Sequence, residues 1–376
     1  MSASLSCELD QDTASTKSPY TPPIPFLIGS VEKNTYQQRL HHYFDSILLS
    51  APSNFNGGIV VAKGGTILYE KYQGFEDPSK KTRPITAGSS FHIASTTKPF
   101  TAIAILGLVD QGKLSLTDTI TRFFPALPYP FVTIHDLLTH RSGLPNYLHF
   151  MQASGWDKKK MATNQDVLQV MISERPACLA APDSRFEYCN TNYVLLALIL
   201  EKIVGMSYPD YLQQVFFKRL GMSHTFVFQP RDTSRIVYSY QQNGMLWPLD
   251  YLDLTYGDKN IYSTPQDLLK WDQALYTDQL IDTSLLQEAF TGTSFERPGT
   301  HNYGLGFRLE MLPNSKKVIY HFGRWHGNNA VFTRLVDEKV TIVILGNRFN
   351  RAIYTAAYHS YALFGNYQTK VEKGQE

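Results

Sequence analysis

The strand-like segments of this sequence lie near its two ends, and mainly helical patterns separate them. Near the N-terminus, residues 57–74 predict a β-hairpin, because two apolar runs flank a glycine-containing turn at 63–66. Strand-like segments resume at 304–309, 317–321, 330–335 and 340–345, whereas 116–256 is mostly helical in pattern. This order predicts an α/β (α+β) fold, with one antiparallel sheet built from both ends, flanked by helices, and an inserted mainly helical region.

The same pattern predicts the domain organisation. We expect a Pro-rich tail over residues 1–35, a single domain over 36–367 and a C-terminal tail over 368–376. Within the domain, the sheet part would comprise 36–115 and 257–367, and the helical region 116–256. Helices are expected over 36–49, 95–112 and 350–364. A chain of 376 residues, 43% of them hydrophobic, can bury a core of this size.

Composition and short motifs exclude several classes of function. The formal net charge is +2, and the longest basic run is 158–160, so nothing favours a nucleic-acid partner. No apolar run approaches the ~20 residues of a membrane-spanning helix. Because His-Glu-x-x-His and Cys-x-x-Cys are absent, we expect no metal and no cofactor. A small-molecule or peptide substrate is the expected partner, and the oligomeric state stays open.

The chain has three cysteines: Cys7, Cys178 and Cys189. Three is an odd number and too few for a disulfide framework. Cys7 precedes a polar, Pro-rich stretch, which would suit the lipid-anchored cysteine of a processed lipoprotein. The alternative is an ordinary cysteine in a tail.

A candidate nucleophile is found in the run Ser95-Thr96-Thr97-Lys98, which opens the apolar segment 99–109. On a helix this spacing places a hydroxyl and an amine on one face, one turn apart. A serine needs such a base to accept its proton. A second Ser-x-x-Lys at 30–33 is assigned to a Pro-rich stretch, residues 19–25 and onward, with no apolar helix behind it, so we favour the first. The alternative for Ser95 is a helix cap beside an exposed lysine.

Two further motifs follow in order, Tyr188-Cys189-Asn190 and His321-Phe322-Gly323. Taken alone, the tyrosine would be a half-buried aromatic residue and the histidine an ordinary strand residue. Together with Ser-x-x-Lys they resemble the three-motif signature of active-site serine penicillin-recognising enzymes. The resemblance is to the branch that holds class C β-lactamases, D,D-carboxypeptidases and related esterases. It runs from about residue 36 to 364, and segments 91–94, 108–118, 133–144 and 303–307 add to it.

The resemblance implies a β-lactamase/transpeptidase-like fold and a set of catalytic roles. Ser95 would attack a carbonyl carbon and form an acyl-enzyme, and Lys98 would accept its proton. Tyr188 would be a second proton carrier, with Lys98 and His321 as cationic neighbours that favour the phenolate. Asn190 would donate a hydrogen bond to Lys98 or to a substrate amide.

The third motif would complete the site. By the same resemblance, the backbone N–H groups of Ser95 and Arg324 would form an oxyanion hole beside Gly323. Many class C β-lactamases have lysine where this chain has His321, which favours a peptidase-like or esterase-like enzyme over a dedicated antibiotic hydrolase. Arg324 could supply a carboxylate contact in place of that lysine.

We therefore expect a serine acyl-hydrolase that acts on a small amide or ester, without a cofactor. The alternatives are a class C-like β-lactamase and a penicillin-binding sensor that is acylated without turnover. The resemblance favours an extracytoplasmic location, and a cytoplasmic one stays open.

Overall fold

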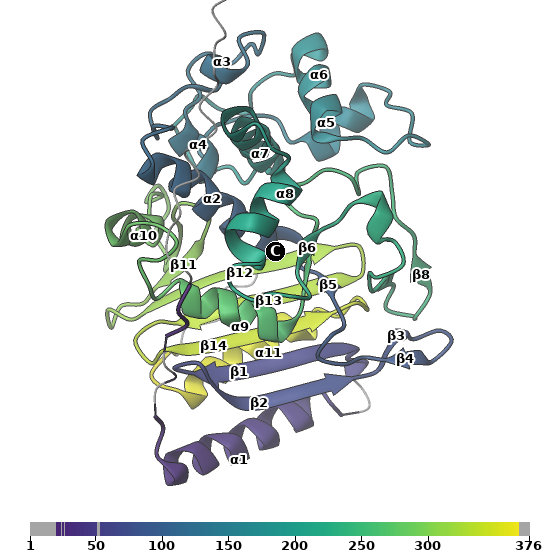
Figure 1. Cartoon of the computed structure of the whole chain (residues 1–376), viewed down its shortest axis with the longest axis vertical. Helices are drawn as coiled ribbons and strands as arrows, with labels where there is room; N and C mark the ends of the chain where they lie inside the picture. The colour runs from purple at the N-terminus through teal and green to yellow at the C-terminus, as the bar shows by residue number, and fades with distance from the viewer. Residues whose placement is uncertain (1–19, 24, 26, 51–52, 368–376) are drawn as a thin grey trace, which may run out of the picture.

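The computed structural model describes residues 20–23, 25, 27–50 and 53–367. Its centre is a seven-stranded sheet in the order β10-β11-β12-β13-β14-β1-β2, in which every neighbouring pair is antiparallel (Figure 1). The strands are β1 (Gly57–Lys63), β2 (Thr66–Gln73), β10 (His301–Tyr303), β11 (Arg308–Met311), β12 (Lys317–Trp325), β13 (Asn328–Leu335) and β14 (Val340–Gly346).

The N-terminal hairpin joins the C-terminal strands directly. Strand β1 pairs with β14 along its whole length, from Gly57 opposite Gly346 to Lys63 opposite Val340. The predicted antiparallel sheet, assembled from both ends of the chain, is therefore confirmed.

Short strands form smaller sheets near the central one. A three-stranded sheet in the order β5-β9-β6 joins the segment before Ser95 to two later parts of the chain. The short strands are β3 (Phe75–Asp77), β4 (Thr82–Pro84), β5 (Phe91–His92), β6 (Phe226–Val227), β7 (Ser239–Tyr240), β8 (Leu246–Trp247) and β9 (Ile261–Ser263).

Helices cover both faces of the sheet, and most of them come from the chain between β2 and β10. They are α1 (Ser30–Ile47), α2 (Lys98–Asp110), α3 (Ile120–Phe123), α4 (Ile134–Leu138), α5 (Tyr147–Ala153), α6 (Asn164–Glu174), α7 (Asn190–Val204), α8 (Tyr208–Leu212), α9 (Pro265–Ala274), α10 (Thr283–Ala289) and α11 (Ala352–Ser360). Single turns of other helix types are η2 (Ala94–Thr97), η3 (Gln213–Phe217), η4 (Pro230–Asp232) and η5 (Tyr361–Leu363).

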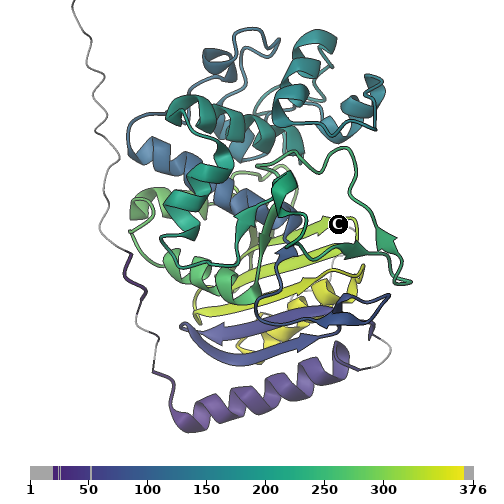
Figure 2. The same ribbon diagram turned by 45° about the vertical axis from the view of Figure 1, so that its right-hand side comes forward.

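The alternation of side chains along β1 produces a layered core. Ile59 and Val61 belong to a buried cluster with α1 and α11, whereas Val60 and Ala62 pack against Leu269 of α9. Each face of the sheet is thus covered by helices, and the helical region lies on the α9 side, away from α1 (Figures 1 and 2). The turn η2 packs against β12 and β13 of this sheet.

Several predicted boundaries were wrong. Helix α1 begins at Ser30, before the expected residue 36, because residues 30–35 contain no proline or glycine that would stop a helix. The second Ser-x-x-Lys therefore does open a helix, but Ser30 is exposed there. At the C-terminal end, residues 304–307 turn rather than extend, with Gly306 at φ +88°, and β11 starts at Arg308.

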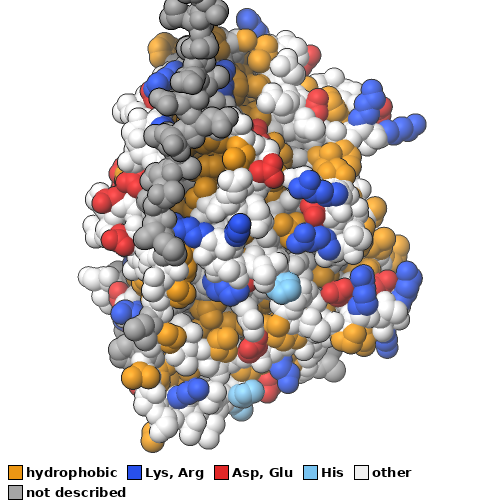
Figure 3. Space-filling view, viewed as in Figure 1, with side chains coloured by type: hydrophobic (Ala, Val, Ile, Leu, Met, Phe, Trp, Pro, Cys, Tyr) orange, Lys and Arg blue, Asp and Glu red, His pale blue; other side chains and the backbone are white. Residues whose placement is uncertain are grey.

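The described residues bear on two further expectations. Within them, no helix combines the length and apolarity needed to cross a bilayer. On the face shown in Figure 3, lysine and arginine side chains are scattered among acidic, apolar and uncharged groups. Cys7 and most of the predicted N-terminal tail lie outside the described residues, as does the predicted C-terminal tail, 368–376.

Candidate active site

Ser95 and Lys98 lie at the junction of a 3-10 turn and a helix. The sequence predicts one continuous helix from 95 to 112, but residues 94–97 form η2 and Lys98 is the first residue of α2. Ala94, just before the serine, has a left-handed backbone with φ +47°, a conformation that strains a residue with a Cβ atom. The turn leaves Ser95 partly exposed while Lys98 is completely buried.

Three oxygen atoms surround the Lys98 amine. Its Nζ lies 3.1 Å from Ser95 Oγ, 2.8 Å from Asn190 Oδ1 and 2.9 Å from the carbonyl oxygen of Asp258. The amide and carbonyl oxygens can only accept hydrogen bonds. Only in its neutral form, with its two protons donated to these oxygens, would the amine keep a lone pair for the Ser95 hydroxyl proton.

We expected Asn190 to donate to Lys98 or to a substrate amide. Its Oδ1 instead accepts from the Lys98 amine, which rules out the first alternative and leaves its Nδ2 for the second. Asn190 is the first residue of α7, which packs against α2, so the two motifs meet through a helix–helix contact. The neighbouring Cys189 is buried, with Sγ 3.6 Å from the Pro145 carbonyl oxygen, and burial raises the pKa of this thiol to about 11. Cys189 thus serves packing.

Tyr188 lies between two cations and an imidazole. Lys98 Nζ lies 4.9 Å from the centre of its ring and Arg308 Cζ lies 5.0 Å from it. The ring of His140 lies 4.2 Å away, centre to centre. The Tyr188 ring is thus packed against two basic side chains and one histidine.

His140 was not among the predicted site residues. It is fully buried at φ +57°, its Nδ1 accepts from the Cys189 backbone N–H at 3.1 Å, and its Nε2 has no hydrogen-bond partner among the described residues. Burial, followed by the charge of Lys98, holds the pKa of His140 well below its usual value, so the ring is neutral. Only the fold brings this histidine against Tyr188, since the two are far apart in the sequence.

The loop that carries Tyr188 is fastened along the segment after α4. The N–H groups of Glu187 and Asp183 donate to the carbonyl oxygens of His140 and Arg141, each at 2.8 Å. A Cβ atom on Gly143, which has φ +66°, would lie 2.1 Å from the Ala180 carbonyl oxygen. Glycine is therefore required where the two segments touch.

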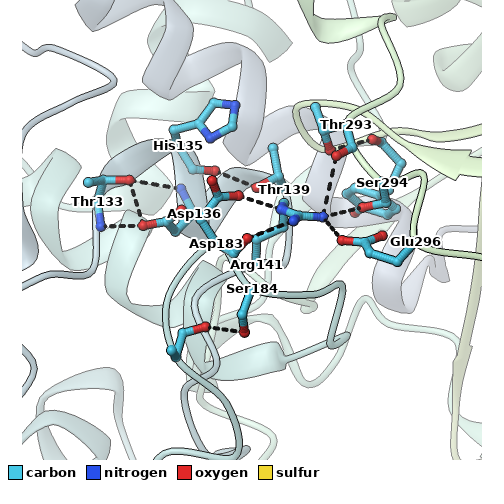
Figure 4. Close-up of polar contacts among 12 residues, drawn as sticks. Thr133, His135, Asp136, Thr139, Arg141, Asp183, Ser184, Thr293, Ser294 and Glu296 are labelled. Atoms are coloured by element: carbon cyan, nitrogen blue, oxygen red, sulfur yellow. Dashed lines mark hydrogen bonds and ion pairs between the residues drawn. The ribbon is translucent and has the colours of Figure 1, made fainter.

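An ion-pair cluster also holds this loop in place (Figure 4). It consists of Arg141, Asp183 and Glu296. Arg141 Nε donates to Asp183 Oδ1 at 2.6 Å, and its Nη1 pairs with Glu296. The same guanidinium donates to the Ser294 hydroxyl at 3.2 Å. One arginine thus joins the Tyr188 loop to the segment before β10.

The third motif lies within β12, which continues to Trp325 instead of ending at His321 as expected. Strand β11 pairs only with residues 317–320 of β12, and the later part of β12 packs against η2. The Thr96 hydroxyl donates to the His321 carbonyl oxygen at 3.1 Å. A Cβ atom on Gly323 would lie 2.2 Å from the Ile93 carbonyl oxygen and 3.0 Å from Ser95 N. Glycine lets this strand touch the nucleophile turn.

His321 is buried and neutral, so it is not a cation for Tyr188 as we had predicted. Burial, followed by the charges of Arg308 and Lys98, holds its pKa well below the usual value. Its Nδ1 bonds the Phe322 carbonyl oxygen at 2.9 Å and its Nε2 faces the Tyr303 hydroxyl at 3.2 Å. A protonated imidazole would be repelled by two nearby cations.

Arg308, which the sequence did not point to, is the second cation beside Tyr188. It is the first residue of β11, and its described contacts are to the Tyr188 ring and the Tyr320 phenol. Arg324, in contrast, is exposed, and its guanidinium lies 5.9 Å from the ring of Phe349. Arg308 is therefore better placed than the Arg324 side chain to meet a charged substrate group.

The structure thus gathers the predicted residues of three distant motifs around one serine. Ser95, Lys98, Tyr188 and Asn190 are linked by the contacts above, and Gly323 touches the serine turn. Among the described residues one group could hold a metal ion, Asp250, Asp253 and His326, and it includes none of these site residues.

An antiparallel sheet packed against a buried Ser-x-x-Lys turn defines a class, the serine hydrolases of the β-lactamase/transpeptidase superfamily. The chain belongs to the beta-lactamase family, whose model matches residues 53–364.

Individual relatives agree with this assignment. The chain is 35% identical over 354 residues to penicillin-binding protein 4* of Bacillus subtilis (strain 168), covering 89% of this chain and 77% of that one. The crystal structure of a penicillin-binding protein from Bacillus halodurans superposes with a TM-score of 0.75 at 25% identity, over 86% of this chain and 99% of that one. D-alanine carboxypeptidase AmpC from Burkholderia cenocepacia shares the fold, with a TM-score of 0.72 at 18% identity over 88% and 99%.

Proposed function

We propose that this protein hydrolyses small amides or peptides through an acyl-enzyme formed on Ser95. The observation that carries the proposal is the buried Lys98 amine, with two acceptor oxygens on one side and Ser95 Oγ at 3.1 Å on the other. An amine placed in this way can accept the hydroxyl proton as the oxygen attacks a carbonyl carbon.

The proposed reaction has two halves. In the first, the Ser95 proton moves to Lys98, a bond forms between Oγ and the substrate carbonyl carbon, and the bond to the leaving amine or alcohol breaks. Lys98, which is close to the Tyr188 ring, would pass this same proton through the Tyr188 hydroxyl to the leaving group, so both side chains end the step as they began it. In the second, water attacks the ester, releases an acid and restores the serine.

The backbone around Gly323 would stabilise the charge that develops on the carbonyl oxygen. The close approach of Gly323 to Ser95 N supports an oxyanion hole made by the N–H groups of Ser95 and Arg324. One such donor is worth roughly 2.7–4 kcal/mol of barrier.

Arg308 supports a substrate that ends in a carboxylate. It is a cation in contact with Tyr188, where the neutral His321 cannot supply the charge. An arginine pairs a carboxylate with two parallel hydrogen bonds, which neither a neutral imidazole nor a lysine can match. This favours a carboxypeptidase-like reaction.

Matched peptides test the proposal. We expect cleavage of an acylated D-alanyl-D-alanine peptide with a free C-terminal carboxylate, and weaker cleavage of the same peptide as its C-terminal amide. Arg308→Gln should raise KM for the acid by about tenfold or more while leaving the amide almost unaffected, and Arg308→Lys should restore part of the loss.

A Ser95→Ala variant, which lacks the nucleophile, is the negative control in every assay. Equal rates on the acid and the amide, unchanged by Arg308→Gln, would refute the carboxylate preference. Activity that persists in Ser95→Ala would refute the whole mechanism.

We also propose that the protein acts outside the cytoplasm, as the family resemblance suggests. Fractionation of producing cells, followed by detection of the chain in each fraction, tests this location. Recovery in the cytoplasmic fraction alone would contradict it.

A further inference from the structure

A second cluster of chemically active side chains lies apart from the serine site. Asp250 and Asp253 come from the loop between β8 and β9, and His326 is at the apex of the β12–β13 hairpin. His326 Nε2 lies 3.4 Å from Asp253 Oδ2 and 3.6 Å from Asp250 Oδ2. One ligand atom from each residue lies within 4.8 Å of the other two.

The histidine nitrogen in this cluster is buried and unsatisfied. His326 Nε2 has no hydrogen-bond partner among the described residues, and the side chains of His326 and Asp253 are only 11% and 2% exposed. Its distances to the carboxylates exceed the 2.7–3.2 Å of an N–H···O bond. The nitrogen is thus within ion-pair distance of two carboxylate oxygens but within hydrogen-bond distance of neither, so the three atoms are spaced like the ligands of one small cation.

Other contacts hold the two carboxylates in place. The Trp325 indole N–H donates to Asp253 Oδ1 at 2.5 Å, and the Leu252 N–H donates to Asp250 Oδ1 at 2.8 Å. In both cases the Oδ2 atom is the one that faces His326, and Asp253 Oδ2 also accepts from the Asp250 backbone N–H at 2.5 Å. The nearby Lys259 amine is occupied elsewhere, since it donates to the Tyr147 hydroxyl at 2.7 Å and the Leu252 carbonyl at 2.8 Å.

The spacing of the cluster fits a small divalent ion. Zinc binds imidazole nitrogen and carboxylate oxygen at about 2.0–2.2 Å, so two ligands of a tetrahedral site are about 3.4 Å apart. The two distances from His326 Nε2 match this edge. One imidazole and two carboxylates also give two negative charges, which a divalent cation neutralises.

We propose that Asp250, Asp253 and His326 bind a zinc ion outside the catalytic site, with water as the fourth ligand. The ion would fasten the end of β12, just past Gly323, to the loop that leads to Asp258. Because the Asp258 carbonyl accepts from Lys98, the ion would stabilise both walls of the serine site without touching a substrate. Sequence motifs miss such a site because its ligands lie far apart in the chain.

Zinc binding to the full chain tests this inference directly. The protein, freed of metals by a chelator, is titrated with zinc chloride by calorimetry. We expect one zinc ion per chain and a higher Tm with zinc. Cobalt(II) in place of zinc should give the intense visible absorption of tetrahedral coordination.

Two variants remove ligands and a third serves as a control. His326→Asn keeps a residue that tolerates the left-handed backbone, φ +53°, and Asp250→Asn changes a partly exposed ligand; each should abolish zinc binding and the Tm rise. His41→Asn removes an exposed histidine that also lies 3.4 Å from one carboxylate, Asp45, and should leave zinc binding unchanged.

The outcomes are independent of the catalytic proposal. Zinc should bind Ser95→Ala as tightly as the unaltered chain. No zinc binding at millimolar concentration, or binding that survives both ligand variants, would overturn the inference.

Discussion

Replacing Gly323 with alanine tests whether the contact between β12 and the nucleophile turn positions the serine. The added Cβ atom would lie 2.2 Å from the Ile93 carbonyl oxygen and 3.0 Å from Ser95 N. Carbon and oxygen need a little over 3 Å, so the strand and the turn must separate by about 1 Å. Misplacement of catalytic groups by that distance costs about 100-fold in rate, or about 2.7 kcal/mol of barrier. Overpacking of this kind also costs about 1–3 kcal/mol of stability.

The assay separates these two effects. We expect kcat/KM for a chromogenic ester and the rate of acylation by benzylpenicillin to fall together by about 100-fold, while circular dichroism shows a folded protein. The matched control is Gly107→Ala, on helix α2, where the added atom would lie 3.8 Å from Ile281, an ordinary contact. It should keep full activity and gain about 0.5–1 kcal/mol of stability. A Gly323→Ala enzyme with normal acylation would refute the positioning role of this contact.

Three further predictions follow from the same geometry. Lys98→Met should lower the acylation rate about 10²–10⁴-fold in a folded protein, whereas Lys33→Met in the second Ser-x-x-Lys should change nothing; equal rates in the two would contradict the role of the base. Arg141→Ala should cost about 1–2 kcal/mol of stability and slow acylation, because it releases the Tyr188 loop. The control is Arg122→Ala, which breaks an exposed ion pair with Asp118; it should cost under about 1 kcal/mol and leave the acylation rate unchanged. Burial lowers the pKa of His140 and of His321 in the folded chain. Below pH ~6.5 the unfolded chain therefore binds protons that the folded chain does not, and the free energy of unfolding decreases as the pH is lowered. Urea unfolding should show a loss of up to about 1.4 kcal/mol per pH unit for each histidine, and a flat profile down to pH ~5 would show that they titrate normally.

The sheet could be predicted because a strand that runs through the core is a run of apolar residues, and such a run is visible in the sequence. The hairpin of β1 and β2 and the strands β13 and β14 are apolar runs bounded by turn residues, and all were found. The start of α1 was missed because residues 30–35 carry no strong signal at the helix N-terminus. Strand β12 runs past the predicted end because its pairing with β13 continues through Gly323 to Trp325.

The site could be predicted only in part, since a motif identifies a candidate residue but does not show its burial or the charges around it. Ser95, Lys98, Tyr188 and Asn190 meet as the resemblance implied, but burial makes His321 neutral and removes the charge we had expected beside Tyr188. Arg308 supplies a cation there instead.

His140 shows the same limit. Its ring contact with Tyr188 depends on the packing of two loops, and no local pattern encodes it. Tertiary contacts of this kind decide the charge and position of groups that the motifs only name.

The most direct test of the central claim is the intact mass of the protein after brief exposure to benzylpenicillin, with the drug's own hydrolysis followed in the same tube. The account predicts a covalent adduct that peptide mapping places on Ser95, or turnover of the drug that is lost in Ser95→Ala. An adduct on another residue, or one that still forms in Ser95→Ala, would contradict it.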